Sequence, residues 1–294
     1  MTGHLLPRVE ALTEAITIKS RQWRDVVKIG RTHLQDAVPI TVGQEWSGYA
    51  AQLEDATGQI RRSLDGLYRL AIGGTAVGTG LGAPAGFGEE AAAEIARLTG
   101  HPFVSAPNKF AALGAPDAMV AAMAGLRALA IDLMEIANDI RWLASGPRCG
   151  LGELRLPANE PGSSIMPGKV NPSQCEVLMM VGIQVLAADS AVAAAGSQGN
   201  LELNTLRPLI IHSFFHSARI LGDASEKLCV YCIEGAELEP QRIRELVERS
   251  LMLGTALSPV IGYDNTAAIA RQAFAEGTTL REAAIASGNH RGDI

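Results

Sequence analysis

The sequence is poor in aromatic residues, which make up 4% of its 294 positions, although 47% of all residues are hydrophobic. Strands favour aromatic and β-branched side chains, whereas alanine and leucine favour helices, so this composition argues against a β-sandwich and for closely packed helices. A chain this apolar is not intrinsically disordered. At about 150 residues per domain, its length corresponds to about two domains, or to one large domain.

Cysteine and positive charge are also scarce. The four cysteines give no disulfide framework for a chain of this length, which is typical of a reducing, cytoplasmic setting. Acidic residues outnumber basic ones by 31 to 25 and no basic stripe is present, so we expect no nucleic-acid partner. The first residues lack the basic and apolar segments of a secretory signal.

Hydrophobic spacing predicts long helices at residues 5–27, 41–71, 116–145, 172–195 and 207–232, and a short amphipathic helix at residues 89–98. Residues 30–39 form a break, residues 73–88 are glycine-rich and irregular, and residues 146–172 form a polar connection. Further helices are expected at 241–252, 266–276 and 279–286. We therefore expect an all-α fold, with a long-helix bundle over residues 1–238 and a small helical domain over residues 239–294.

One apolar segment, residues 177–196, is long enough to span a bilayer. It contains Gln184 and Asp189, which a lipid-facing helix rarely carries, so a central position in a large helical bundle explains it better. A single chain offers such a helix few partners. We therefore expect several copies of the chain to share their helices, and no membrane association.

The strongest functional pattern is GSSIMPGKVNP at residues 162–172. Two hydroxyl groups lie between flexible glycines, and Lys169 precedes Asn171 and Pro172, which suit the N-cap and N1 positions of the next helix. A lysine beside a helix N-terminus attracts a carboxylate or a phosphate. On spacing alone, a surface loop with a capping asparagine explains the pattern equally well, and Gln174 would complete a capping box.

This segment closely resembles the signature of the fumarase/aspartase superfamily, and the surrounding sequence resembles class II fumarases in particular. Supporting stretches are KIGRTHLQDA at 28–37, GQE at 43–45, NDIR at 138–141, PANEP at 157–161, GNLELN at 199–204 and IGYD at 261–264. The resemblance covers essentially the whole chain. His33 makes the sequence more similar to fumarases than to aspartases, because aspartases tend to carry glutamine at that position.

The resemblance implies reversible hydration of fumarate to L-malate, without a metal or an organic cofactor, in a homotetramer with composite active sites. It implies that Ser163 is the base that removes the C3 proton of malate. It also implies that His33, oriented by Glu176, works through a water molecule to protonate the departing hydroxyl. The residues that it assigns to substrate binding are Thr32, Ser164, Lys169, Val170 and Asn171.

Several candidate residues also have plain structural explanations. His33 alone could be a satisfied loop histidine, and Glu176 a first-turn helix carboxylate favoured by the helix dipole. His212 and His216 have the spacing of helical metal ligands but no nearby third ligand, so we expect no metal there. Cys229 and Cys232 are expected to be buried packing residues.

The sequence also departs from the family pattern. Family members are typically longer, with an N-terminal region that supplies further substrate-binding motifs, and no such motif precedes Thr32. Residues 288–294 do not match the usual ending. Three functions therefore stay open: a fumarase that needs another polypeptide for full activity, an aspartase-like ammonia-lyase, and a superfamily member that acts only in assembly.

Overall fold

The computed structural model of the chain describes residues 1–160 and 165–288. The chain divides into two compact units. The first unit comprises Met1–Thr13, Ala51–Arg141 and Asn171–Glu234, and the second comprises Glu14–Ala50, Trp142–Val170 and Gly235–Ile294. The predicted domain boundary at residues 238 and 239 stays a prediction.

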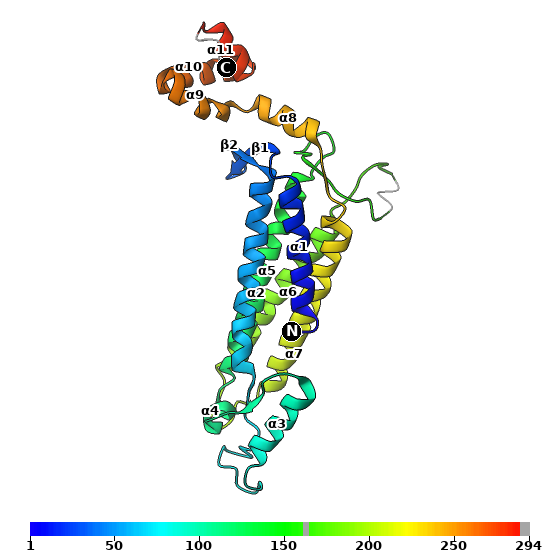
Figure 1. Cartoon of the computed structure of the whole chain (residues 1–294), viewed down its shortest axis with the longest axis vertical. Coiled ribbons are helices and arrows are strands. Elements are labelled where there is room, and N and C mark those ends of the chain that lie inside the picture. Colours follow the sequence, from blue (N-terminus) through cyan, green and yellow to red (C-terminus); the bar gives the residue numbers. More distant parts are fainter. Residues whose placement is uncertain (161–164, 289–294) are drawn as a thin grey trace. The chain divides into compact units, whose positions relative to one another are not determined.

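Helices dominate both units (Figure 1). They are α1 (Leu5–Gln22), α2 (Val42–Leu67), α3 (Phe87–Thr99), α4 (Lys109–Gly114), α5 (Asp117–Leu143), α6 (Ser173–Gly196), α7 (Arg207–Leu228), α8 (Pro240–Arg249), α9 (Gly254–Ile261), α10 (Tyr263–Glu276) and α11 (Leu280–Ala286). A π-helix over Cys229–Ile233 continues α7, and a 3-10 helix over Leu251–Leu253 precedes α9.

The strands are short and pair two by two. Strand β1 (Val27–Thr32) pairs antiparallel with β2 (Gln35–Thr41) as a hairpin. Strand β3 (Arg69–Leu70) pairs parallel with β4 (Val104–Ser105), and β5 (Leu154–Arg155) pairs antiparallel with β6 (Glu237–Leu238). The hairpin and the β5–β6 pair both belong to the second unit.

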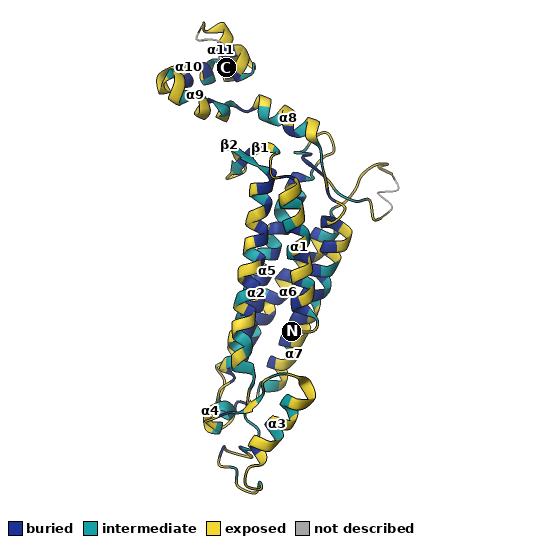
Figure 2. Cartoon of the chain, viewed as in Figure 1, coloured by how far each residue is buried: buried dark blue, intermediate teal, exposed yellow. Residues whose placement is uncertain are grey.

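In the first unit, α5, α6 and α7 run side by side (Figure 1). Their buried positions form stripes along the helices, drawn in dark blue in Figure 2. Alternating steps of three and four residues, typical of helices that pack along one face, separate these buried residues. They are Leu126, Leu129, Leu133, Ile136 and Ile140 on α5, and Phe214, Ala218, Leu221, Ser225 and Leu228 on α7. The predicted long-helix bundle is confirmed.

Helix α6 carries the apolar segment that the sequence analysis singled out. Leu178, Val185 and Val192, seven residues apart, are fully buried on one face of the helix. Asp189 Oδ2 lies 2.8 Å from Arg127 Nη1 of α5, so its charge is paired within the bundle. Among the described residues, α6 is the helix whose length and composition would also suit a membrane crossing.

In the second unit, an aromatic cluster lies where the β-hairpin meets α2. The rings of Trp23 and Trp46 meet edge to face, with centroids 4.7 Å apart, and Tyr49 lies 6.1 Å from Trp46. Helices α10 and α11 form a separate small core with Leu251, Leu253 and Ile261. Its buried members are Ile269, Ala273, Leu280, Ala283 and Ala284. The small helical region expected near the C-terminus is therefore present.

Two local predictions need correction, and helix α9 was missed. The break at 30–39 is a β-hairpin, whose turn lacks the glycine or asparagine that usually marks one. Helix α6 has Pro172 as its N-cap, so Asn171 is not the cap and does not form a capping box with Gln174. Helix α9 was not predicted, because Pro259 lies inside it and proline disfavours a helix interior.

Candidate active site

The turn of the β1–β2 hairpin presents two of the predicted site residues. Thr32 pairs with Gln35, which leaves His33 and Leu34 as the two central residues of the turn. Both have positive φ, 56° for His33 and 58° for Leu34, as in a type I′ turn. Residues other than glycine rarely adopt this conformation, and such strain is concentrated at functional sites. Thr32 and His33 are exposed at the tip, so their side chains are accessible in a single chain.

The described part of the signature segment is also exposed. Ser163 and Ser164 lie outside the described residues, so their positions stay predictions. From Ile165 to Asn171 every residue is exposed, and the backbone N–H of Lys169 donates to Met166 O at 3.3 Å. The side chains of Lys169, Val170 and Asn171 are therefore open to a ligand or to another copy of the chain.

Glu176 lies in the first turn of α6, as expected, where the helix dipole favours a carboxylate. Its side chain is about half exposed, and its Oε1 lies 3.6 Å from Nη2 of Arg141 on α5. Arg141 is itself held in place, because its Nη1 donates to Asn138 Oδ1 at 3.3 Å. Arg141 is thus a partner of Glu176 that the sequence analysis quoted but did not assign.

The predicted site residues are divided between the two units. Thr32, His33, Lys169 and Val170 belong to the second unit, whereas Asn171 and Glu176 belong to the first. The orientation of His33 by Glu176 stays a prediction.

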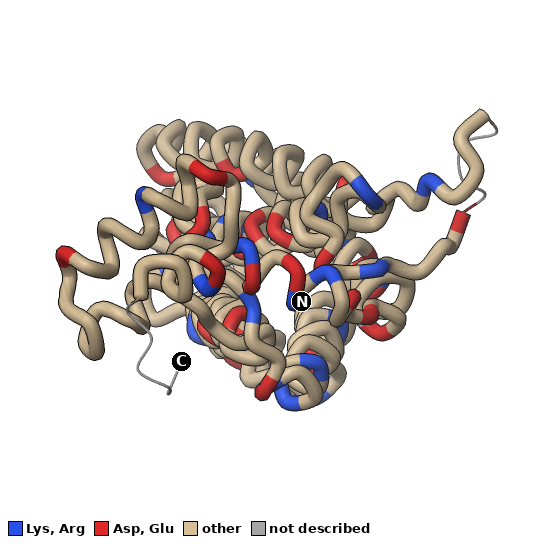
Figure 3. The backbone as a smooth tube through the Cα atoms, turned by 90° about the horizontal axis from the view of Figure 1, so that it is seen from above, with Lys and Arg blue, Asp and Glu red and all other residues tan. Residues whose placement is uncertain are grey.

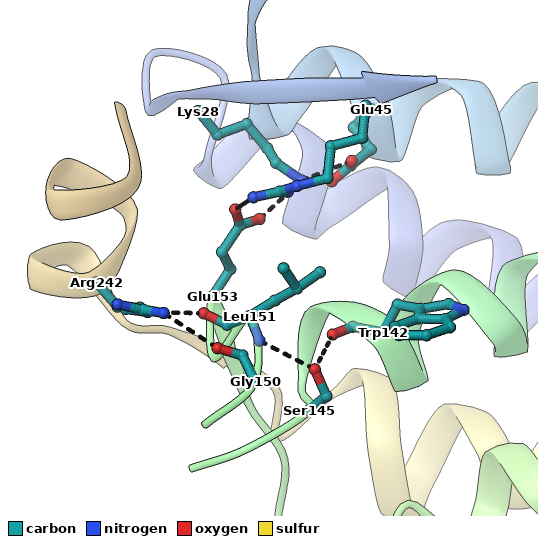
Figure 4. Close-up of polar contacts among 9 residues, drawn as sticks. Lys28, Glu45, Trp142, Ser145, Gly150, Leu151, Glu153 and Arg242 are labelled. Carbon is teal, nitrogen blue, oxygen red and sulfur yellow. Dashed lines mark hydrogen bonds and ion pairs between the residues drawn. The ribbon is translucent and has the colours of Figure 1, made fainter. Parts of the chain in front are cut away.

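A buried cluster of four charges lies beside the hairpin, and the sequence analysis did not single it out (Figure 4). The ammonium group of Lys28 donates to both carboxylate oxygens of Glu45, at 2.6 and 2.8 Å, and lies 2.9 Å from Glu153 Oε2. Arg31 Nη2 donates to Glu153 Oε1 at 2.8 Å. The side chains of Lys28 and Glu153 are only 2% and 3% exposed. Glu153 therefore bridges two cations of strand β1.

The segment that leads into Glu153 is fixed by further hydrogen bonds (Figure 4). Arg242 of α8 donates to two backbone carbonyls, Leu151 O at 2.9 Å and Gly150 O at 3.1 Å. The backbone N–H of Leu151 donates to Ser145 Oγ at 3.0 Å. These contacts hold the chain in a defined path shortly before the signature segment.

The cysteines pack in the interior, apart from Cys149. Cys175 Sγ lies 3.9 Å from Cys232 Sγ, and both residues are buried, as is Cys229. Hydrogen bonding to Cys232, together with burial, raises the pKa of Cys175. Burial raises the pKa of Cys229 to about 11. The prediction that Cys229 and Cys232 are packing residues is confirmed by their burial.

This arrangement predicts how the thiols react. Because a thiolate is the reactive form, native protein near neutral pH should react rapidly with a disulfide reagent at one thiol, Cys149, which is exposed. Unfolded protein should react at all four cysteines. A thiol count on native and denatured protein measures this difference. Rapid reaction of two or more thiols in the native protein would contradict the packing described here.

Among the described residues, neither the distribution of charge (Figure 3) nor a set of metal ligands indicates a further site. Basic and acidic positions are intermixed along the chain in Figure 3, as their near balance predicts. Across residues 1–160 and 165–288, no group of three or more His, Cys, Asp or Glu side chains is arranged to hold a metal ion. His212 and His216 stack on α7, with ring centroids 6.2 Å apart.

Comparison with known proteins places the chain in a family. A family described as "Lyase" matches residues 1–187, and one described as "Fumarase C C-terminus" matches residues 253–291. The chain is 63% identical over 287 residues to a class II fumarate hydratase of Methanosarcina acetivorans, covering 98% of this chain and 59% of the relative. It is 58% identical over 284 residues to that of Thermosynechococcus vestitus, covering 97% and 61%.

A solved structure agrees with these sequence relatives. The crystal structure of a class II fumarase from Schistosoma mansoni matches with a TM-score of 0.94 at 42% identity, over 99% of this chain and 64% of that one. The chain thus spans about 60% of the length of the curated relatives it matches. The fold expected from the sequence is confirmed, and the chain belongs to the class II fumarase family of the fumarase/aspartase superfamily.

Proposed function

We propose that the chain carries the catalytic core of a fumarate hydratase, a lyase that reversibly adds water to fumarate to give L-malate. The observation that carries this proposal is the 63% identity to a class II fumarate hydratase over nearly the whole chain. The exposed, strained turn at His33 and Leu34 supports it, because it presents an accessible imidazole, the side chain that most often serves in general acid–base catalysis.

In the direction of dehydration, Ser163 takes the C3 proton of malate, so its hydroxyl must first be deprotonated. The negative charge that forms spreads into the adjacent carboxylate of the substrate. Lys169 and Asn171 stabilise that carboxylate, since preorganised donors lower the energy of a developing charge. His33, oriented by Glu176, delivers a proton through a water molecule to the C2 hydroxyl, which leaves as water. The products are fumarate and water, and no cofactor takes part.

Thr32, Ser164 and Val170 complete the proposed substrate contacts. Thr32 directly precedes His33 in the turn, and Val170 lies between Lys169 and Asn171. Binding of both substrate carboxylates would fix the reacting carbon atoms relative to Ser163 and His33, which is a large part of catalysis by orientation. These assignments follow the family signature residue by residue.

We further propose that the enzyme is a homotetramer in which neighbouring copies build each pocket. Apolar side chains support this, because the exposed face of α6 carries Val177, Met180 and Ile183, which are 40%, 62% and 58% exposed. Exposed apolar patches of this kind mark interfaces between chains. Leu34 and Val38 are likewise exposed around the hairpin turn. A monomer in sedimentation experiments would contradict the tetramer.

The proposed compartment is the cytoplasm, which the unpaired cysteines support, since disulfides are rare in reducing compartments.

An assay with fumarate, malate and aspartate tests the proposed reaction. We expect hydration of fumarate and dehydration of malate, weak or absent for this chain alone and restored when a second polypeptide supplies the region of the relatives that it does not match. The Ser163→Ala variant should lose the activity. Release of ammonia from aspartate without turnover of malate would identify an ammonia-lyase instead. An assembled, folded chain that shows neither activity even with that second polypeptide would identify a member that acts only in assembly.

A further inference from the structure

We propose that Glu153 is a positioning residue of this enzyme: through Arg31 and Lys28, it fixes the Thr32–His33 turn against the segment that leads into the signature loop. The proposal rests on the proposed function, because it assigns a role to a residue that does not itself touch the substrate. All the residues that carry it belong to the second unit.

An irregularity in the hairpin lets both cations reach one carboxylate. In a regular strand, residues 28 and 31 would point to opposite faces, because side chains alternate. The register shifts between Ile29 and Arg31. Residues 29–31 of β1 lie opposite residues 36–39 of β2, so β2 has one additional residue there. A bulge of this kind re-aims side chains. The extra residue lies on β2, and on either side of this irregularity Lys28 and Arg31 lie 2.9 and 2.8 Å from the two oxygens of Glu153.

Gly30 makes this bulge possible. An added Cβ at Gly30 would lie 2.9 Å from Val38 O on β2, closer than real side chains approach a carbonyl. The backbone of β1 therefore approaches β2 closely at the point where the register shifts. This close approach explains why position 30, which belongs to the family stretch KIGRTHLQDA, holds a residue without a side chain.

The backbone of Glu153 is anchored by two hydrogen bonds. Its backbone N–H donates to Leu143 O at 2.8 Å, and its carbonyl accepts from the N–H of Glu239 at 2.9 Å. Strand β5 begins at the next residue and leads towards the signature segment. Because both backbone groups of Glu153 are bonded, its carboxylate is a fixed point against which Arg31 is held. Arg31 directly precedes Thr32, so the constraint acts one residue from the turn.

The charges of the cluster balance, with two carboxylates and two cations. A buried ion pair contributes little net stability, because desolvation of both charges offsets their attraction. Its geometry is nevertheless demanding, since each carboxylate oxygen of Glu153 faces a different cation. We therefore assign the cluster to positioning of the turn rather than to stability of the unit.

Hydrogen exchange of the turn, measured by mass spectrometry on the full chain, tests this role. In Glu153→Gln, peptides covering residues 27–41 should exchange about tenfold faster or more, as expected for loss of a hydrogen bond between charged groups. Arg31→Met, which leaves Glu153 paired with Lys28, should do the same and serves if Glu153→Gln does not fold. Arg31→Lys keeps the charge and should restore protection to within about threefold of the wild type.

The matched control is Glu237→Gln. Glu237 pairs with Arg155 on the neighbouring β5–β6 ladder, and both side chains are largely exposed. Its loss should leave exchange of residues 27–41 unchanged, because exposed ion pairs contribute little. If Arg31→Met and Arg31→Lys protect the turn equally, side-chain bulk suffices and the proposal is wrong. Unchanged exchange in both Glu153→Gln and Arg31→Met would also overturn it.

Measurement of kcat in the same variants distinguishes a positioning role from a general effect on the fold. In a double-mutant cycle, Glu153→Gln and Arg31→Met should each lower kcat by about tenfold, and together by no more than the larger single effect, because both remove one contact. Additive losses would overturn the proposal. If the wild type shows no turnover even when the unmatched region of the relatives is supplied as a second polypeptide, the proposed function fails, whereas the exchange measurements still decide whether Glu153 holds the turn.

Discussion

Replacement of His33 by glutamine is expected to lower hydratase turnover by about 10²- to 10⁴-fold, the usual contribution of a general acid–base group. Glutamine keeps a polar side chain in the turn but cannot transfer a proton. The His33 side chain is exposed, so the free energy of unfolding should stay within about 0.5 kcal/mol of the wild type. Steady-state measurement of fumarate hydration, with chemical denaturation alongside, separates the two effects.

The control for this substitution is Gln35→Ala. Gln35 closes the same turn, and its amide donates to Leu34 O at 3.2 Å, but its side chain has no role in the proposed chemistry. Turnover should therefore remain within about threefold of the wild type, as for other exposed substitutions of small effect. Equal losses in His33→Gln and Gln35→Ala would mean that the turn matters only as structure, and His33 would lose its assigned role.

The second large effect is on stability. Replacing Trp46 by alanine is expected to lower the free energy of unfolding of the second unit by about 3 to 5 kcal/mol, as for other buried aromatic residues. Trp46 is fully buried and packs edge to face against Trp23 and against Tyr49. Its removal leaves a cavity between α2 and the residues before β1, where the hairpin begins.

Trp46→Phe is the matched control. The indole Nε1 of Trp46 is buried and has no hydrogen-bond partner among the described residues, so phenylalanine would lose no hydrogen bond. We expect it to cost less than about 1.5 kcal/mol, as other conservative hydrophobic replacements do. The three tryptophans of the chain all lie in the second unit, so tryptophan fluorescence during urea unfolding reports on this unit. Similar losses in both variants would contradict the packing described for Trp46.

Helical periodicity predicted most of the fold, because the buried residues of α5 and α7 recur every three or four positions in the sequence. The hairpin was missed for a local reason. His33 and Leu34 adopt positive φ without the sequence signal of a type I′ turn, and the strain is sustained by the pairing of β1 with β2. Local propensity does not report a conformation that neighbouring structure imposes.

The charged cluster was beyond sequence reasoning for a different reason. Arg31 and Glu153 are 122 positions apart, and no spacing rule joins charges at that separation. The stretches that resemble the family contain Lys28, Arg31 and Glu45, but nothing in the sequence assigned a role to these residues. For the site itself, the resemblance to the family signature supplied the residues. The prediction that Asn171 is the N-cap of α6 was wrong, because Pro172 is the N-cap and Asn171 precedes it. That position leaves the Asn171 side chain free of the capping role, and the residue is exposed.

The central claim is that His33 of one copy and Ser163 of another form one active site, and mixing two inactive variants tests it most directly. His33→Gln and Ser163→Ala chains are assembled separately and together, with the unmatched region of the relatives supplied as a second polypeptide. Each variant alone should be inactive, and co-assembly should restore about a quarter of wild-type turnover, because chains combine at random in a symmetric oligomer. A mixture as inactive as its two components, with both variants assembled and the wild type active, would contradict the account.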